Sequence, residues 1–378
     1  MGILFRLKQN IKMYIQNVYL PQIYRKEISR TRVNPDKIIL ADMHSDSIPF
    51  SMKEIYNSLV SKGKKPTIYC RDTQKMSPFE TMKFMKEFMR EYAAAGYVYI
   101  CSYFLPVSSC EKRKETKVIQ LWHSGGLLKK MGYDTSDDIP EYYKGNVTAN
   151  YDLVTVSADI CVPVWEQAWK LPKGITKAAG LARTDSYFDN EWNENCINEF
   201  YEMYPEAKGK KVALYAPSFS GNASAPYCAG IESGIEKLMD KFKDDWFFLI
   251  SLHPHLKGKY PDYFRGKYGK LPTERIIPVV SLLITDYSSV LFDYAIYKKP
   301  FVLFCPDIEE FQKNRGFYTD IMAFPAPLAK TMDELEDVMM RKLYFEYDEE
   351  EYVDFCNKYM GACDGNSADR IIELAEKL

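Results

Sequence analysis

The segment "LLITDYSSVLFDYAIYKKPFVLF", residues 282–304, contains the alternation that decides the fold. An apolar, β-rich run at 281–286 ends at Asp286, a helical pattern fits residues 288–298, and a second apolar run follows at 300–305. A strand, a helix and a strand in this order predict a βαβ unit with two parallel strands.

The same alternation extends through the chain in both directions. In the N-terminal half, apolar runs predict strands at 37–42, 65–70, 97–102, 117–122, 151–157 and 175–180, with helices at 52–62, 79–95 and 158–169. In the C-terminal half, the predicted strands are 211–217, 246–252, 275–279, 281–286 and 300–305, and the predicted helices are 231–243, 288–298, 332–345, 348–359 and 366–377. This pattern indicates parallel sheets with helices on both faces.

Two such series in 378 residues, a length too great for one ordinary core, predict an α/β protein with two Rossmann-like domains. We expect a basic N-terminal segment at 1–35, an N-terminal domain at 36–182 and a C-terminal domain at 183–378. The last predicted helix, at 366–377, can pack back on the N-terminal domain.

The composition is that of an ordinary globular protein, with 46% hydrophobic and 27% charged residues. The nine cysteines are scattered and never spaced as CxxC, which favours reduced thiols in a cytosol over disulfides or a zinc site. The sequence shows no signal-peptide pattern and no apolar run of 18 residues. It also contains no GxG motif, so it gives no indication of a dinucleotide site or a P-loop. We therefore expect no NAD enzyme and no ATPase.

The first 35 residues differ in charge from the rest of the chain. They hold seven basic side chains and one acidic side chain, a net charge of +6, so the remainder carries −8 within the total of −2. Apolar residues at 3, 4, 7, 11, 14, 15 and 18 form one face of a helix. Such a helix can lie on an anionic membrane or dock on its own domain, and both interpretations stay open. Nucleic acid is not expected, because the basic residues do not continue into the body of the chain.

Polar residues follow several predicted strands, where open parallel sheets bind their ligands. The four exits are "LWHSGG" at 121–126, "YAPSFSGN" at 215–222, "SLHPH" at 251–255 and "TDYSS" at 285–289. His123 could act as a general base or could be a packing histidine. His253 could donate to a phosphate oxygen, whereas a metal site with His255 is disfavoured because no carboxylate or cysteine lies at ligand spacing.

Ser288 and Ser289 stand where a helix is predicted to begin. Backbone N–H groups and the helix dipole at such a position favour phosphate, and the two hydroxyls add donors. The alternative is that Ser288 only caps the helix.

Taken together, these motifs resemble the CDP-glycerol glycerophosphotransferase family, which includes teichoic-acid primases and polymerases. The motifs, in the order of the family, are "LWHSGGLLKKMG", "GLARTDSYFD", "YAPSF", "SLHPH", "ITDYSSVLFDYAIYKKPFVLF", "RGFYTD" and "CDGNSADRI". The resemblance extends from about residue 36 to 378. It implies a two-domain fold of the GT-B type, with the nucleotide held mainly by the C-terminal domain and the acceptor entering from the N-terminal side.

The resemblance also implies a reaction and its partners. An acceptor hydroxyl attacks the β-phosphorus of CDP-glycerol, CMP leaves, and glycerol phosphate is transferred, with no cofactor. The implied partners are CDP-glycerol or another CDP-alditol, a lipid-linked glycan or polymer as acceptor, and the inner face of the bacterial cell membrane, on which the protein would be peripheral.

The matching motifs give individual residues their implied roles. His123 would be the base, His253 would contact the diphosphate, and Ser288 and Ser289 would bind phosphate oxygens. The other residues implied to bind substrate are Ser124, Gly125, Arg183, Asp185, Ser218, Thr285, Asp286 and Arg315.

The chain departs from the common pattern at two motifs. Many members have Gly-Thr-Pro after the Trp-His pair, where this chain has residues 124–126, and many have an arginine after "YAP", where it has Ser220. Loss of an arginine near a diphosphate removes a charge-assisted contact. CDP-ribitol therefore stays open as a donor. A nucleotide-sugar glycosyltransferase of the same two-domain type and a non-catalytic partner that tethers a polymer-making complex to the membrane are the further alternatives.

Overall fold

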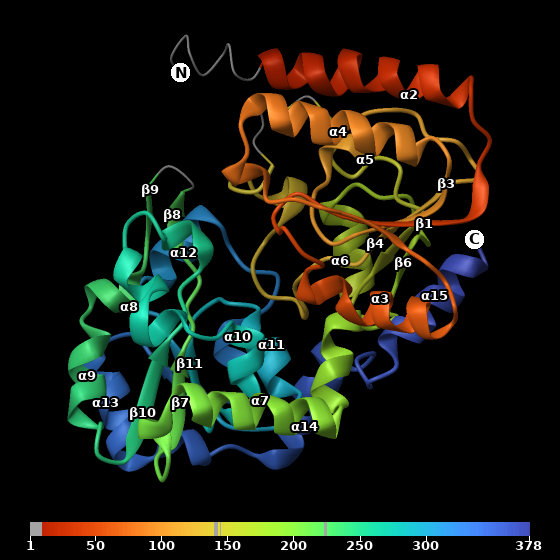
Figure 1. Cartoon of the computed structure of the whole chain (residues 1–378). Coiled ribbons are helices and arrows are strands. Elements are labelled where there is room, and N and C mark those ends of the chain that lie inside the picture. The colour runs from red at the N-terminus through yellow and green to blue at the C-terminus, as the bar shows by residue number, and fades with distance from the viewer. Residues whose placement is uncertain (1–9, 140–142, 144, 223–224) are drawn as a thin grey trace. The chain divides into compact units, whose positions relative to one another are not determined.

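The computed structural model describes residues 10–139, 143, 145–222 and 225–378, which fold into two compact units (Figure 1). The first unit comprises Met1–His123, Glu141–Asp185 and Ala362–Leu378, and the second comprises Ser124–Pro140 and Ser186–Gly361. The chain thus passes between the units several times: the last helix belongs to the first unit, as the sequence allowed, but residues 124–140 belong to the second unit, and the later crossing follows Asp185 instead of residue 182.

The first unit is built on a six-stranded parallel sheet in the order β2-β1-β3-β4-β5-β6. All six strands predicted in this half are present, although several are shorter than expected: β1 Asn34–Asp42, β2 Thr67–Cys70, β3 Ala95–Ile100, β4 Lys117–Gln120, β5 Leu153–Thr155 and β6 Thr176–Lys177. The last five residues of β1 are all buried, which explains its continuous apolar run.

Helices cover both faces of this sheet (Figure 1). The three predicted helices are α3 Phe50–Ser61, α4 Pro78–Tyr92 and α6 Cys161–Ala168. Ser77 and Glu80 begin α4 with a capping box. The C-terminal helix α15, Ser367–Glu376, lies against α3, where Asp369 accepts hydrogen bonds from Ser58 (Oγ) and Lys62 (Nζ).

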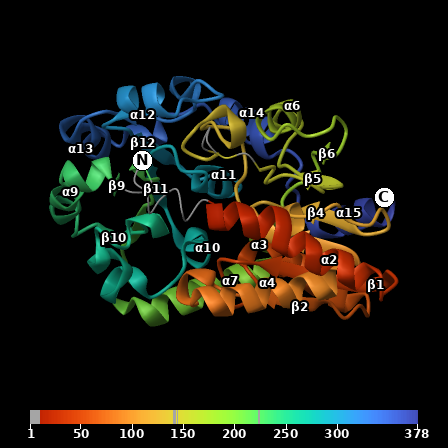
Figure 2. The ribbon, with the colours of Figure 1, turned by 90° about the horizontal axis from the view of Figure 1, so that it is seen from above.

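The N-terminal segment is helical from residue 10, with a π-helical turn at η1, Ile15–Tyr19, followed by α2, Leu20–Ile28. Figure 2 shows α2 alongside α4, and Leu20 and Tyr24 are fully buried. Ile11 and Tyr14, by contrast, are 51% and 57% exposed. The predicted apolar face is therefore divided: α2 docks on its own unit, positions 11 and 14 face solvent, and positions 3, 4 and 7 lie outside the described residues. Among the residues that the structure describes, no helix is long and apolar enough to cross a membrane.

The second unit has a five-stranded parallel sheet in the order β10-β7-β11-β12-β13. Its strands are β7 Lys211–Tyr215, β10 Trp246–Ile250, β11 Leu282–Thr285, β12 Phe301–Phe304 and β13 Leu328–Ala329. A small antiparallel hairpin, β8 Ser220–Asn222 and β9 Ala225–Tyr227, follows β7. The helices are α7 Asn190–Met203, α8 Ala229–Glu232, α9 Ile235–Lys241, α10 Thr273–Ile276, α11 Val290–Ala295, α12 Ile308–Asn314, α13 Met332–Arg341 and α14 Glu349–Met360.

The strand predicted at 275–279 was wrong. These residues form the end of α10 and the 3₁₀ turn η9, Ile277–Val279, in which Ile276, Ile277 and Pro278 are buried. A short apolar run fits a buried helical turn as well as a strand, and Pro278 lacks the N–H group that a central strand needs.

Each sheet contains a switch point, where the strand order reverses. In the first sheet β1 lies between β2 and β3, and in the second β7 lies between β10 and β11. Ligands of open parallel sheets bind at the carboxyl ends of the strands at such points. The exits of β1 and β3, and those of β7 and β11, are therefore the positions at which to look for a site.

Candidate active site

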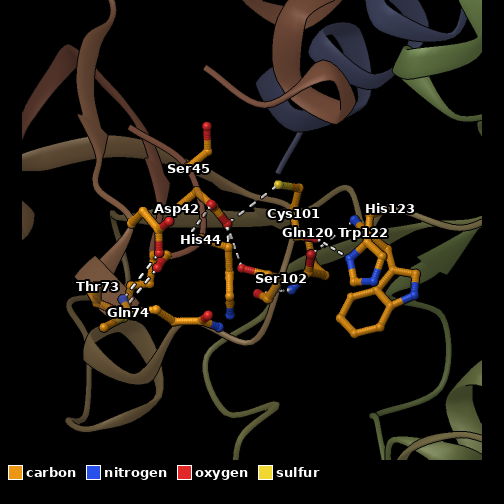
Figure 3. A network of polar contacts seen from close by, with 12 residues as sticks. Asp42, His44, Ser45, Thr73, Gln74, Cys101, Ser102, Gln120, Trp122 and His123 are labelled. Atoms are coloured by element: carbon orange, nitrogen blue, oxygen red, sulfur yellow. Dashed lines mark hydrogen bonds and ion pairs between the residues drawn. The ribbon is translucent and has the colours of Figure 1, made fainter. Parts of the chain in front are cut away.

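A buried carboxylate lies at the switch point of the first unit. Asp42 ends β1 and is 2% exposed. The Ser102 hydroxyl donates to Asp42 Oδ1 at 2.7 Å, and the backbone N–H of His44 donates to Asp42 Oδ2 at 2.7 Å. Burial raises the pKa of Asp42, but the hydrogen bonds from His44 and Ser102 outweigh it and hold the pKa below its ordinary value. Asp42 is therefore an anion, and Figure 3 shows its contacts with His44 and Ser102.

The His44 side chain lies against this anion. Its Nδ1 is 3.6 Å from Asp42 Oδ1, and the side chain is 57% exposed. The contact with Asp42 raises the pKa of His44 above its ordinary value, and the charge of Asp72 acts in the same direction.

His123, the predicted base, follows β4 on the same edge of the sheet. Its Nδ1 is 2.9 Å from the carbonyl oxygen of Cys101, and its ring stacks on Trp122 with the centroids 4.1 Å apart. Against a carbonyl oxygen, Nδ1 must carry the proton, so Nε2 presents a lone pair in the neutral ring. His123 is exposed as a residue, but the protein atoms packed around its ring displace water and lower its pKa to about 4. The charge of Arg183 acts in the same direction, whereas the hydrogen bond to Cys101 opposes the shift.

The backbone at His123 is fixed by its neighbours. Trp122 has a φ of +56°, and its N–H donates to Gln120 Oε1 at 3.0 Å. Gln120 Nε2 in turn donates to the Ser102 carbonyl oxygen at 3.0 Å. Arg183, in the 3₁₀ segment η4, Ala182–Phe188, donates to the His123 carbonyl oxygen. Two predicted site residues, His123 and Arg183, are therefore in contact.

Asp185 has a different surrounding. Its carboxylate accepts from the N–H groups of Ser367 at 3.0 Å and Ala368 at 2.7 Å, which begin α15. Burial raises the pKa of this carboxyl group. Asp185 therefore stabilises the start of the C-terminal helix, and its contact with substrate stays a prediction.

The second unit repeats the buried carboxylate at its own switch point. Asp286, after β11, is 7% exposed and accepts from Ser218 N at 2.7 Å and from Ser218 Oγ at 2.9 Å. Burial raises the pKa of Asp286 to about 6. Thr285 Oγ1 donates to the Ala216 carbonyl oxygen at 2.7 Å. Three predicted substrate ligands, Ser218, Thr285 and Asp286, thus join the exits of β7 and β11.

Lys129 lies close enough to interact with this carboxylate and with Arg315. Burial lowers the pKa of Lys129 to about 8, with a further contribution from Arg315, whereas Asp286 opposes the shift. Arg315 Nε donates to the Lys130 carbonyl oxygen at 3.0 Å. Residues 127–130 also pair with 316–319, as in the bond from Tyr318 N to Leu128 O at 2.7 Å. This pairing places the loop after His123 in the second unit.

The serines before α11 are half-buried. Ser289 takes the N-cap position, but its side chain makes no capping hydrogen bond in the structure described here. Ser124 is half-buried and Gly125 is buried in the loop after His123. The next residue, Gly126, has a φ of +66°, and a Cβ atom there would lie 2.3 Å from the Phe292 ring.

His253 begins a 3₁₀ turn, η6, Pro254–Leu256. Its Nδ1 accepts from the His255 N–H at 3.3 Å, and its ring contacts the Phe219 ring with the centroids 4.8 Å apart. With Nδ1 as acceptor, Nε2 carries the proton in the neutral ring and can donate. Within the described parts of the chain, no group of three His, Cys, Asp or Glu side chains could hold a metal ion.

Sequence reasoning missed Asp42, His44, Ser102 and Lys129. The signal for Asp42 and His44 was available, because "DMHSDS" at 42–47 stands at the exit of the predicted strand 37–42, and Ser102 stands at the end of the predicted strand 97–102. Lys129 carried no such signal, since its surroundings depend on the pairing with residues 316–319.

The fold and these strand exits define an α/β protein of two units, each with a buried carboxylate and a histidine at the carboxyl edge of a parallel sheet. The family model described as "CDP-Glycerol:Poly(glycerophosphate) glycerophosphotransferase" matches residues 23–377. The chain therefore belongs to this family, as the motifs predicted.

Two primases are among its relatives. A teichoic acid ribitol-phosphate primase of Bacillus spizizenii is 29% identical over 359 residues, covering 90% of this chain and 91% of the primase. A teichoic acid glycerol-phosphate primase of Bacillus subtilis is 28% identical over 290 residues, covering 73% and 72% of the two chains.

Polymerases are similar as well. A teichoic acid poly(ribitol-phosphate) polymerase of Bacillus spizizenii is 27% identical over 90% of this chain, which spans 56% of that enzyme. The structure of the wall teichoic acid polymerase TagF matches with a TM-score of 0.73 at 19% identity, over 99% of this chain and 96% of that chain. At this identity the likeness concerns the fold.

Proposed function

We propose that this protein transfers an alditol phosphate from a CDP-alditol to an acceptor hydroxyl and releases CMP. The proposal includes a GT-B type architecture of two Rossmann-like domains, in which the second unit binds the donor and the first binds the acceptor. The observation that carries it is the state of His123 in a chain of this family: the ring is neutral, its Nδ1 proton is directed to the Cys101 carbonyl, and Nε2 is left as a proton acceptor.

In the proposed step, His123 Nε2 takes the proton of the acceptor hydroxyl as the oxygen attacks the β-phosphorus. The new oxygen–phosphorus bond forms while the bond from that phosphorus to the bridging oxygen breaks, and CMP leaves with the electron pair. CMP is a stable anion and needs no proton. The main tasks of the other residues are therefore to place the phosphates and to stabilise their charge.

The second unit supplies donors suited to a diphosphate. His253 Nε2–H follows β10, and the hydroxyls of Ser288 and Ser289 follow β11, so these polar groups lie after the two strands that flank β7. Lys129 and Arg315 add positive charge. Asp286 and Ser218 fix the exits of β7 and β11 in this arrangement, because a buried carboxylate with two hydrogen bonds joins the two segments.

Two donor alcohols are candidates. Glycerol is the first, because it is the substrate in the description of the matching family. Ribitol is the second, because the relative that is 29% identical over 91% of its length is a ribitol-phosphate primase. The acceptor that we propose is a lipid-linked glycan or polymer, which would place the protein at the inner face of the cell membrane.

The test is CMP release from CDP-glycerol, CDP-ribitol and UDP-glucose as donors, each with a glycerol-phosphate-primed acceptor. Release of CMP with one CDP-alditol, and no reaction with UDP-glucose, is expected and identifies the alcohol. Turnover of UDP-glucose alone would replace the proposal by a glycosyltransferase. No turnover with any donor would favour the tethering partner.

A further inference from the structure

The polar cluster at the exit of β1 has no role in the transfer proposed above. Asp42 and Ser102 lie at the switch point of the first sheet, just as Asp286 and Ser218 lie at that of the second. In both units a buried carboxylate after one strand accepts a hydrogen bond from a serine hydroxyl after the neighbouring strand. The serine–carboxylate distances are 2.7 Å and 2.9 Å. The first unit adds one feature, an exposed histidine beside the carboxylate.

His44 is oriented by this carboxylate. Its Nδ1 faces Asp42 Oδ1 at 3.6 Å, so Nε2, on the opposite side of the five-membered ring, is directed away from Asp42. Asp42 is 3% exposed at its side chain while His44 is 57% exposed, so the pair has a buried anionic end and an accessible imidazole end. A ligand can reach the imidazole without displacing Asp42.

The charges around His44 favour its protonated form. Asp42 is an anion with an oxygen facing Nδ1, and the charge of Asp72 adds to its effect. Lys75 pairs with both Asp72 and Asp46, at 3.0 Å each, and so offsets part of their acidic charge. His123 on the same edge is neutral, so it does not compete for the anion.

We propose that His44, held by Asp42, binds a phosphate oxygen of a substrate at the exit of β1, as an imidazolium that donates through Nε2. The two histidines of this edge then have separate tasks: neutral His123 accepts the proton, and charged His44 binds the anion. Helix α3, which begins directly after this loop at Phe50 and has no side-chain cap at Pro49, adds a favourable dipole for an anion. The identity of the phosphate as part of donor or acceptor rests on the proposed function.

Two variants separate charge from shape. His44→Gln keeps a hydrogen-bond donor but loses the charge, and we expect it to raise the KM of one phosphate-bearing substrate about ten- to a hundredfold with kcat changed less than threefold. His44→Lys should recover most of this loss. Lys75→Gln is the matched control, because it removes a nearby cation that pairs with Asp46 and Asp72 and does not contact Asp42.

The substrate whose KM rises identifies the source of the phosphate. A rise for the acceptor alone assigns His44 to the acceptor, and a rise for the CDP-alditol alone assigns it to the donor. Unchanged KM values for both substrates in His44→Gln would overturn the proposal, as would an equal rise in Lys75→Gln. The pH profile gives a second readout: the apparent affinity of the wild type should fall above the pKa of His44, whereas His44→Lys should keep its affinity to higher pH.

A binding experiment keeps this inference separate from the proposed transfer. The chain has four histidines, so their ring signals can be assigned by NMR with His→Gln variants of the full-length protein. In the wild type, inorganic phosphate should raise the pH at which the His44 signal titrates. In Asp42→Asn, which lacks the partner charge, phosphate should leave this titration midpoint unchanged. A shift of His44 without turnover of any donor supports the site while rejecting the transfer. A His44 signal that phosphate does not move rejects the site, whatever the turnover.

Discussion

At the scale of the residue, the environments of two histidines on one sheet edge push their pKa values in opposite directions. The protein around the ring of His123 favours the neutral form and outweighs the opposing effect of the hydrogen bond to the Cys101 carbonyl oxygen. His44 has a carboxylate at Nδ1, which favours the charged form. Burial dominates at His123 and the contact with a carboxylate dominates at His44, and this balance decides which imidazole can accept a proton and which can bind an anion.

Replacement of His123 by glutamine should abolish most of the transfer activity. A general base contributes about 10²- to 10⁴-fold, so we expect kcat to fall by this factor while KM changes little. The thermal unfolding midpoint should stay close to that of the wild type, because one hydrogen bond of a solvent-accessible ring is lost. CMP release and a melting curve measure the two quantities, and normal kcat with an unchanged melting curve would exclude His123 as the base.

The pH profile tests the same residue in the wild type. Only the neutral form of His123 can accept a proton, and its pKa is lowered to about 4. We therefore expect kcat/KM to decrease, through protonation of His123, only as the pH falls through about 4. An unperturbed histidine would place this acid limb near 6.5. An acid limb of kcat/KM near 6.5 that disappears in the glutamine variant would contradict the neutral environment described above.

Asp286 should make the unfolding free energy depend on pH. Its folded-state pKa, about 6, lies above the unfolded value of about 3.8, so the folded state binds the proton more tightly. The resulting stabilisation is complete below the unfolded value and is lost as the pH rises through 6. As the pH rises from 5.0 to 7.5, deprotonation of Asp286 alone should lower the free energy of unfolding by about 1 to 2 kcal/mol.

Asp286→Asn should abolish this loss, because asparagine does not titrate. Urea unfolding of wild type and variant at the two pH values measures the difference between them. Ser218→Ala serves as a second variant: it removes a hydrogen bond to the charged form, so the pH dependence should become steeper. Equal slopes for the wild type and Asp286→Asn would show that the carboxyl group is not perturbed.

At the scale of the element, the sequence allowed most strands to be predicted, because parallel strands that are buried on both faces appear as short continuous apolar runs. The run 281–286 became β11 at Leu282–Thr285, with Asp286 at its exit as expected. The run 275–279 is also short and largely apolar, but it contains Pro278 and became a helical turn. Local pattern cannot separate the two, because burial of an apolar run does not depend on its hydrogen-bonding pattern.

The site was predictable to the extent that it follows from single strands. His123, His253 and Asp286 were found because each one ends an apolar run, and the position of a strand exit is a property of local sequence. The hydrogen bonds that hold these side chains could not be predicted. The carbonyl of Cys101, which pairs with His123, and Ser218, which pairs with Asp286, follow neighbouring strands, and only the order of strands in the sheet brings them together. The pKa direction of a histidine depends on these partners, and so the opposite states of His44 and His123 needed the structure.

At the scale of the whole molecule, the chain makes two long-range returns, and only the return of the last helix was expected from sequence. Residues 124–140 follow β4 of the first unit but belong to the second, where 127–130 pair with 316–319. Residues 362–378 end the chain in the first unit, where Asp185 accepts from the start of α15. Both returns are set by hydrogen bonds between segments about 185 residues apart, which leave no periodic signal near either partner.

The charge asymmetry of the chain leads to a prediction for the molecule as a whole. The N-terminal helical segment, described from residue 10 onward, docks through Leu20 and Tyr24 and leaves Ile11 and Tyr14 facing solvent, three positions apart and beside Lys12. Arg25 and Lys26 are also exposed. Two apolar side chains on one helical face with basic neighbours fit the interface of an anionic membrane, whereas a purely docked helix has no need of them.

The double variant Ile11→Ser with Tyr14→Ser should weaken binding to phosphatidylglycerol-containing vesicles about tenfold or more, because about 1 kcal/mol or more is lost for each side chain that no longer inserts. Arg25→Gln with Lys26→Gln should weaken it by a similar factor at low salt, since each basic residue contributes roughly 1 kcal/mol near such a surface. Phe79→Ser on α4 is the matched control, as its ring is 79% exposed on a different helix of the same unit. Vesicle sedimentation measures the binding. If both double variants bind like the wild type, the segment is a docked helix whose basic residues are only solvated.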